Sequence, residues 1–373
     1  MVFESFSRAE QVDKELWNRL AQHAAPTMEW EYFRALEESG AVSRDKGYRP
    51  FHLVGYEGGE PVLLAPFYER DRAWVEFGDG GLIEFLTELT GMPFNVGLVG
   101  TIPFTPVPGY RFLHRSGEEP VALYRALLHY LDHLCETKGF ATCRIYFTAA
   151  DAVRLREVLK GHGYVGLKNE HCRWFNPGFT SFEEYLGTFR SARRTKIKRE
   201  LRTVRDRGVA VRMLAGEDVP ASYFGRMYQL YRRTWEKHMG TLIAPFLNED
   251  FFRLLDENFR HRCAFSTAFR EEEVVAMAIF YAKERKLYGR YWGTFEEIPF
   301  LHFATCYYHP LDYAIRQGME MMDPGFGGEH KLFRGYEIVP VYHFIKFYGE
   351  EPRRVAGAVL KQMSDRGRPV GFR

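Results

Sequence analysis

The order of the secondary-structure elements that the sequence predicts repeats once along the chain. Residues 14–174 indicate helices, a β-hairpin, a helix, a strand, another helix and a last strand. Residues 182–347 follow a similar order, although the two passes share few identical residues. Both passes mix helices with strands, including one hairpin each, so we predict a mixed α/β chain of two similar modules. We place the first module at residues 1–177 and the second at residues 178–373.

Each pass contains one clearly patterned β-hairpin. In the first, the apolar runs 51–56 and 61–68 flank Glu57-Gly-Gly-Glu60. Two apolar runs around a Gly-Gly turn are typical of antiparallel strands. In the second, residues 263–269 and 275–281 flank a polar turn. Both modules are therefore expected to contain antiparallel sheet.

Charge and cysteine content limit the partners and the compartment. The 373 residues include 51 basic and 49 acidic ones, a net charge of +2, so attraction to a nucleic acid or a membrane must be local. Five scattered cysteines without a CxxC pair favour reduced thiols. The N-terminus has no apolar signal region, and the longest uncharged run, residues 89–110, contains four prolines and four glycines. We expect a cytoplasmic protein without a transmembrane segment.

The strongest local charge lies in residues 190–207, where nine basic residues face two acidic ones. Ile197, Leu201 and Val204 recur at helical spacing, and Ser191 is a suitable N-cap, so the segment predicts an amphipathic basic helix. A solvated helix face explains this run as well as binding to a phosphate-bearing substrate, a tRNA or an anionic membrane does. Under the binding interpretation, the anion contacts are Arg193, Arg194 and Lys198.

A glycine-rich segment with clustered charges follows the short predicted strand Met319–Met322. Residues 323–331 contain three glycines within four positions, and Arg334 follows shortly after. Glycines let the backbone approach a ligand and present amide groups to an anion, and nearby ionisable side chains suit acid–base chemistry. A solvated loop around a structural turn is the alternative. We predict catalytic roles for Glu329, His330 and Lys331 and anion contacts at Gly327 and Gly328.

Residues 286–293 predict a strand rich in aromatic residues. Alternation places Tyr288, Arg290 and Trp292 on one face, and Leu287 on the other. Arg290 is either a cation at the edge of a core strand or an anion contact in a groove. The predicted substrate contacts are Arg290, Tyr291, Trp292, His302 and Arg334.

Residues 301–317 predict a helix that ends at Gly318. Pro310 should kink this helix because it lacks a backbone N–H. His302 and Cys306 have the i, i+4 spacing of metal ligands, but no second pair has zinc-like spacing. We therefore expect no metal site and a packed Cys306 thiol without a catalytic role.

Several of these segments together resemble the FemAB-like acyltransferases, in particular the branch of predicted N-acyltransferases linked to peptidoglycan biosynthesis and recognition. The resemblance is carried by residues 103–109, 182–186, 193–200, 287–293, 301–308 and 328–336. It implies two GNAT-like modules with a groove between them, and transfer of an acyl or aminoacyl group to an amine. The chain departs from the family pattern at several places: Ala304 replaces a glutamate, His309 replaces a glutamine, and residues 323–327 and 70–95 differ from the usual patterns.

The resemblance leaves the donor open between an acyl-coenzyme A and an aminoacyl-tRNA, and implies no tightly bound cofactor. Residues 293–299 match the turn with which GNAT modules bind the pyrophosphate of coenzyme A, and Glu296 and Glu297 would repel a pyrophosphate there. The basic helix would suit a tRNA donor. The acceptor would be a small molecule or a cell-wall precursor that carries an amine.

The predicted mechanism uses the glycine-rich segment and its charges. Glu329 or His330 would take the proton of the acceptor amine. Lys331, Arg334 or Arg290 would stabilise the carbonyl oxyanion or hold the phosphate of the donor.

Two other functions stay open at this point. The first is a non-catalytic GNAT-like protein that binds a cell-wall or lipid-linked ligand, which the loss of the family glutamate at Ala304 favours. The second is an adaptor that contacts a membrane or RNA through the basic helix. DNA binding is not expected, whereas peripheral membrane contact is compatible with the sequence.

Overall fold

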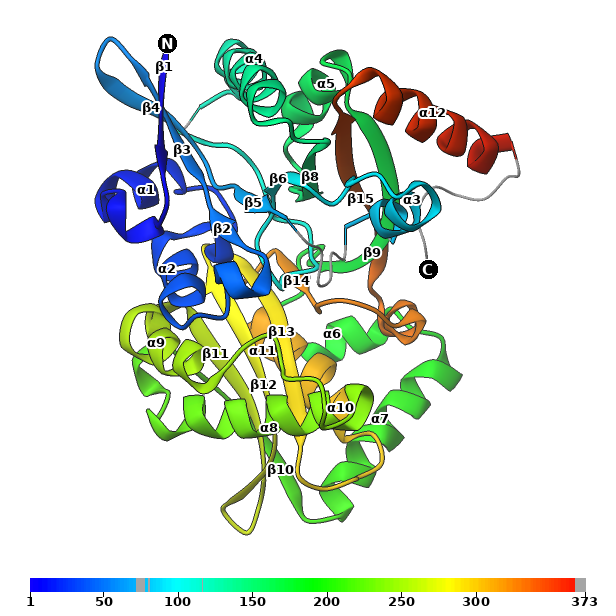
Figure 1. Cartoon of the computed structure of the whole chain (residues 1–373). Helices are drawn as coiled ribbons and strands as arrows, with labels where there is room; N and C mark the ends of the chain where they lie inside the picture. The colour runs from blue at the N-terminus through cyan, green and yellow to red at the C-terminus, as the bar shows by residue number, and fades with distance from the viewer. Residues whose placement is uncertain (72–77, 80, 116, 366–373) are drawn as a thin grey trace. The chain divides into compact units, whose positions relative to one another are not determined.

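The structure is a computed structural model that describes residues 1–71, 78–79, 81–115 and 117–365, with only the backbone described at 363–365. The chain divides into two units, each with its own helices and strands (Figure 1). Unit 1 contains Met1–Glu170 and the chain from Pro340 onward, and unit 2 contains His171–Val339. Over the described residues, no helix is both long and apolar enough to cross a membrane.

The C-terminal residues belong to unit 1, whereas the sequence analysis placed them in the second module. Strand β15 (Glu337–Phe347) pairs with β8 (Thr142–Thr148) in antiparallel register. Helix α12 (Glu350–Asp365) then packs Ala356 into the same apolar core as Phe94. The paired residues of β8 and β15 lie about 200 positions apart in the sequence. Local sequence patterns do not encode such distant pairings.

Unit 1 contains one sheet of order β1-β3-β4-β7 and a second run of strands in the order β9-β15-β8-β6-β5-β2. Besides β8 and β15, its strands are β1 (Val2–Phe6), β2 (Arg49–Pro50), β3 (His52–Glu57), β4 (Glu60–Ala65), β5 (Tyr68–Arg70), β6 (Gly97–Gly100), β7 (Leu113–His114) and most of β9 (Val165–Phe175). Besides α12, its helices are α1 (Lys14–Leu20), α2 (Trp30–Glu38), α3 (Leu82–Thr90), α4 (Val121–Lys138) and α5 (Val153–Gly161), with short 3-10 turns η1 (Ala9–Gln11), η2 (Pro26–Met28) and η3 (Arg44–Lys46). The hairpin predicted in the first pass is confirmed as β3 and β4, which pair antiparallel.

Unit 2 is built on the strand order β10-β11-β12-β13-β14, with β14 next to the end of β9. Its strands are β10 (Val209–Ala215), β11 (Cys263–Arg270), β12 (Glu273–Lys283), β13 (Lys286–Thr294) and β14 (Met321–Asp323). Its helices are α6 (Phe182–Gly187), α7 (Ser191–Asp206), α8 (Ser222–Met239), α9 (Glu249–Phe259), α10 (Leu301–Phe303) and α11 (His309–Arg316), with the turns η4 (Gly216–Asp218), η5 (Arg260–Arg262), η6 (Ala304–Tyr308) and η7 (Glu329–Arg334). The hairpin predicted in the second pass is confirmed as β11 and β12.

Helices cover both faces of the unit 2 sheet. On one face, Tyr231 of α8 and Phe252 of α9 contact Tyr291 of β13, with ring centroids 5.1 and 6.0 Å apart. On the other, Ile197 of α7 and Leu311 of α11 belong to the same apolar core as strands of the sheet. The predicted amphipathic basic helix is confirmed as α7, which buries its apolar stripe against the sheet and leaves most of its cations exposed.

Strand β13 does not keep the strict alternation that we predicted. Its pairing with β12 shifts register between Gly289 and Trp292, where two residues of β13 lie opposite one of β12. Such a bulge exchanges the two faces of a strand beyond it. Trp292 therefore packs against the core that contains Leu287, and Tyr291 faces α8 and α9. The prediction that Leu287 and Trp292 lie on opposite faces is wrong.

The helix predicted at residues 301–317 is present but interrupted. Between α10 and α11 it widens into η6, a π-helical turn, directly before Pro310. Proline cannot donate a backbone hydrogen bond to the preceding turn, and a π turn is one way to accommodate this. Cys306 lies in η6 and belongs to the apolar core, and burial raises the pKa of its thiol. The prediction of a packed thiol is thus confirmed.

Candidate functional site

The three residues predicted for catalysis lie on one turn, η7, which follows the glycine-rich loop. Within it, Lys331 and Arg334 are only 1% and 4% exposed, whereas Leu332 and Phe333 are 39% and 54% exposed. A 3-10 turn brings side chains three residues apart to the same side. We therefore call Lys331 and Arg334 the inner side of η7, and Leu332 and Phe333 its outer side.

The inner side is fixed first by a buried ion pair with the basic helix. Arg334 donates through Nη2 to Glu200 Oε2 at 2.9 Å, and the Tyr308 hydroxyl donates to the same carboxylate oxygen. Arg334 also donates through Nη1 to the His330 carbonyl at 2.8 Å and lies 3.6 Å from the ring centroid of Phe303. A buried pair with these extra hydrogen bonds holds its members in one geometry. Arg334 therefore orients the backbone of η7 at His330.

Glu200 is the part of this network that sequence reasoning missed. It is 1% exposed, although it lies in the most basic segment of the chain. A signal was present, because Glu200 follows Ile197 by three residues and precedes Val204 by four, and so lies on the apolar side of α7. An acid on the buried stripe of a helix requires a buried partner, and Arg334 supplies it.

The inner side is also fixed by a second buried network under the glycine-rich loop. Lys331 Nζ donates to the Gly325 carbonyl at 2.6 Å, and the Gly325 amide donates to Asp323 Oδ1 at 3.0 Å. Asp323 is fully buried, and its carboxylate also bonds His171 at 2.8 Å and Arg173 at 3.0 Å. Burial opposes ionisation of Asp323, but His171 and Arg173 outweigh it and lower its pKa. Buried hydrogen bonds from Lys331 and to Asp323 thus fix the backbone of the glycine-rich loop at Gly325.

His330 lies half-buried between the two sides of η7. Its Nε2 shares a hydrogen bond of 2.9 Å with the Tyr307 hydroxyl, and its ring centroid is 5.4 Å from that of Phe303. Burial lowers the pKa of His330, and the charges of Arg334 and Lys331 lower it further. The imidazole is therefore neutral at pH 7 and able to accept a proton.

His302 packs against both Trp292 and His330, two other residues that the sequence analysis placed at the site. Its ring centroid is 5.0 Å from Trp292, 5.3 Å from Tyr307 and 5.9 Å from His330. Burial lowers the pKa of His302 to about 4, and the charges of His330, Lys331 and Arg334 act in the same direction. His302 is therefore a neutral packing partner of His330 at pH 7.

Gly327 and Gly328, which directly precede η7, are required for different reasons. Gly327 and Gly328 both have positive φ, 79° and 88°, which strains any other residue. A side chain at Gly328 would in addition overlap the imidazole of His330, whereas one at Gly327 would meet nothing within 4 Å. Gly328 therefore leaves the space that the His330 ring occupies.

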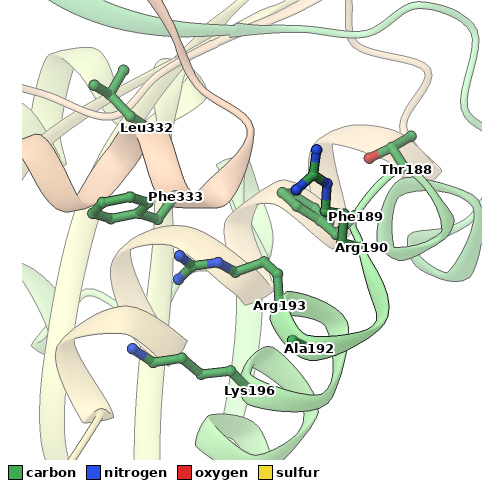
Figure 2. Close-up of a pocket in the computed structure, with 8 residues that line it drawn as sticks. All are labelled: Thr188, Phe189, Arg190, Ala192, Arg193, Lys196, Leu332 and Phe333. Carbon is green, nitrogen blue, oxygen red and sulfur yellow. The ribbon is translucent and has the colours of Figure 1, made fainter.

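A pocket of about 570 Å³ lies between the outer side of η7 and the start of α7 (Figure 2). It is lined by Thr188, Phe189, Arg190, Ala192, Arg193, Lys196, Leu332 and Phe333. Figure 2 shows Arg193 and Lys196 extending from α7, with Phe333 beside them. The Arg193 guanidinium lies 4.6 Å from the centroid of the Phe333 ring. Cations beside an exposed aromatic ring suit a ligand that is both anionic and planar.

Other predicted site residues lie elsewhere. Arg194 donates to a backbone carbonyl just before α7, and Lys198 pairs with an acid of α6, so neither lines the pocket. Glu329 is exposed at the start of η7. Arg290 is half-buried at the bulge of β13, 5.3 Å from the ring centroid of Tyr291. The roles predicted for Arg194, Lys198, Glu329, Arg290 and Tyr291 are not tested by these positions and stay predictions.

A family model for FemAB-like proteins, described as peptidoglycan biosynthesis and recognition, matches residues 8–366. A comparison with curated proteins found no match.

Solved structures share the fold at low sequence identity. FemX matches with a TM-score of 0.58 and 10% identity, over 95% of this chain and 99% of that one. The C-terminal domain of a putative lysylphosphatidylglycerol synthetase from Agrobacterium fabrum matches with a TM-score of 0.55 and 11% identity, over 95% and 96%. L-PGS from Bacillus licheniformis matches with a TM-score of 0.50 and 13% identity, over 94% and 96%. The predicted fold class, a mixed α/β chain of two GNAT-like modules, is confirmed.

Proposed function

This chain belongs to the FemAB-like family of peptidoglycan biosynthesis and recognition, and on that premise we propose that it is an N-acyltransferase that moves an acyl or aminoacyl group onto an amine. One observation carries the proposal. The single turn η7 holds a neutral, half-buried His330 and also forms one wall of a pocket bordered by cations. A base and an anion site on one rigid segment are what transfer from a phosphate-bearing donor requires.

His330 is the proposed general base. An acceptor amine is protonated at neutral pH, with an ordinary pKa near 10, and must lose a proton before its nitrogen attacks the acyl carbon. The neutral imidazole takes that proton directly or through water, and Tyr307 orients the ring. Nearby Arg334 and Lys331 disfavour the imidazolium, so the proton passes on to solvent. The second proton that the nitrogen loses after attack goes to the departing sulfur or ribose oxygen of the donor. The backbone N–H groups of Gly327 and Gly328 would stabilise the oxyanion.

The pocket is the proposed site of the donor. Acyl-coenzyme A and aminoacyl-tRNA both carry an adenosine with phosphate attached. Arg190, Arg193 and Lys196 would bind the phosphate, and Phe333 would stack on the base. The acceptor would be a small amine or a cell-wall precursor, and the proposed location of the reaction is the cytoplasm, where both donors occur. The groove predicted between the two modules stays a prediction.

Transfer of a radiolabelled acyl or aminoacyl group from each donor to amine acceptors tests the proposal. His330→Gln should lower kcat about 100-fold, because it removes the base. Arg193→Met should raise KM for the donor, while Lys198→Met, on the same helix but outside the pocket, should change neither constant. Unchanged turnover in His330→Gln would reject the mechanism.

Donor binding without turnover would instead favour the non-catalytic binding protein. The observation behind that second candidate is Ala304, which is 1% exposed where the family has a glutamate.

A further inference from the structure

The segment that joins α8 to α9 exposes apolar side chains. Residues 237–244 are all exposed, and Leu242 is 99% exposed. Met239 and Ile243, on the same segment, are 46% and 41% exposed. Single exposed apolar residues are common on proteins, but three of them within five positions form a local cluster of the kind that marks an interaction surface.

This segment is held in shape. Trp235 of α8 donates through its indole Nε1 to the Ile243 carbonyl at 2.7 Å. The Trp235 ring also packs on Phe246, with centroids 4.6 Å apart, and Phe246 is buried. The tip of the segment is thus tied back to α8, and Leu242 is presented outward by this arrangement.

Positive charge borders the apolar tip. Arg232, Arg233 and Lys237 lie on the last turns of α8, and no acid occurs in residues 237–247. The nearest acid in the sequence, Glu236, pairs with Arg232, and Glu297 pairs with Lys237. Cations next to a few exposed apolar side chains complement a surface with negative headgroups above an apolar layer.

We propose that residues 237–247, which comprise the end of α8 and the connection to α9 and are here called the α8–α9 segment, insert Met239, Leu242 and Ile243 into the interface of a membrane that contains anionic phospholipid. The three side chains form a small tip, whereas a stable protein interface needs roughly 800 Å² from each partner. A tip of this size suits the shallow depth, about 5–10 Å, at which peripheral segments enter a bilayer. Trp235 lies next to this segment on α8. Its side chain has an apolar ring and a polar N–H, and tryptophan is enriched at membrane–water interfaces for this reason. This inference does not depend on the transferase activity.

Co-sedimentation of the full chain with phosphatidylcholine vesicles, with and without phosphatidylglycerol, tests the proposal. We expect binding to the anionic vesicles, and Leu242→Asp should weaken it at least about tenfold because a charge cannot enter the apolar layer. Leu89→Asp is the matched control, because Leu89 is an apolar residue of α3 in unit 1 that is 59% exposed. It should bind like the unaltered chain.

A second measurement locates the contact. An environment-sensitive fluorophore on Leu242→Cys should shift its emission to the blue when anionic vesicles are added, and the same label on Leu89→Cys should not. Three results would overturn the proposal: no vesicle binding, binding unaffected by Leu242→Asp, or self-association that Leu242→Asp abolishes in the absence of vesicle binding. Loss of binding only when Arg199 and Arg202 of α7 are neutralised would also overturn it, because it would assign the contact to the basic helix.

Discussion

The inner side of η7 consists of two cations that are buried and bonded within unit 2, while its outer side consists of two apolar residues that border an open pocket. Both sides belong to the same six residues. Because Arg334 is held by Glu200 and Lys331 by the glycine-rich loop, the turn cannot shift without breaking buried polar contacts. This rigidity lets the outer side and His330 keep fixed positions for a ligand.

The largest effect should come from breaking the inner side. Glu200→Ala leaves the Arg334 guanidinium buried without its carboxylate, and we expect the free energy of unfolding to fall by roughly 3–5 kcal/mol in urea denaturation. Glu183→Ala, which removes an exposed partner of Lys198, should change it by less than about 0.5 kcal/mol. If the free energy of unfolding falls by less than about 0.5 kcal/mol in both variants, the inner side does not fix the turn.

A side chain at Gly328 should impair transfer more than stability. Gly328→Ala and Gly327→Ala both place alanine at positive φ, and each should cost about 1 kcal/mol of stability. Only the first displaces the His330 ring, so we expect its turnover to be at least about tenfold lower than that of Gly327→Ala. Steady-state kinetics and thermal unfolding of the two variants measure this difference. Equal turnover would show that the position of His330 does not matter for transfer.

The pH dependence of stability should report the burial of His302. Burial lowers the pKa of His302 from 6.5 to about 4, so the unfolded chain binds this proton more readily. Stability is therefore lost as the pH falls from 6.5 toward 4. His302→Phe should reduce this loss by an amount of the order of 1–2 kcal/mol between pH 7 and pH 5, measured by urea unfolding at both values. Burial also lowers the pKa of His343 to about 3, so both proteins should still lose some stability as the pH falls. An unaltered slope would contradict the burial of His302.

The smallest change in stability should come from the outer side. Phe333→Ala should alter the free energy of unfolding by less than about 0.5 kcal/mol, because the ring is 54% exposed. It should nevertheless weaken binding of adenosine 5′-monophosphate about tenfold in calorimetry, since in the proposed donor site the ring would stack on the base. Phe326→Ala is the control: Phe326 is 66% exposed but does not line the pocket. Equal affinity in both variants would remove Phe333 from the site.

Local sequence patterns predicted the parts of the fold that depend on neighbouring residues. The two hairpins follow from apolar runs around turns. The basic helix and the glycine-rich turn were also predicted at their positions.

Features that depend on distant pairings were not predicted. The bulge in β13 is set by its register against β12, and the place of β15 in unit 1 is set by its pairing with β8. Asp323 was seen only as the start of a loop, because its partners His171 and Arg173 lie about 150 residues earlier. At η7, the sequence indicated a cluster of charged residues but not the orientation of their side chains: nothing local shows that Lys331 is buried while Leu332 is exposed.

The central claim is that a ligand on the outer side of η7 lies within reach of His330. Carbon-edited NMR of protein labelled in its histidine rings, titrated with adenosine 5′-monophosphate, tests this claim most directly. The account predicts that the His330 resonance shifts and saturates, that the His343 resonance of unit 1 stays in place, and that Phe333→Ala weakens the response. Nucleotide binding that leaves the His330 resonance unmoved, or shifts all histidines alike, would contradict it.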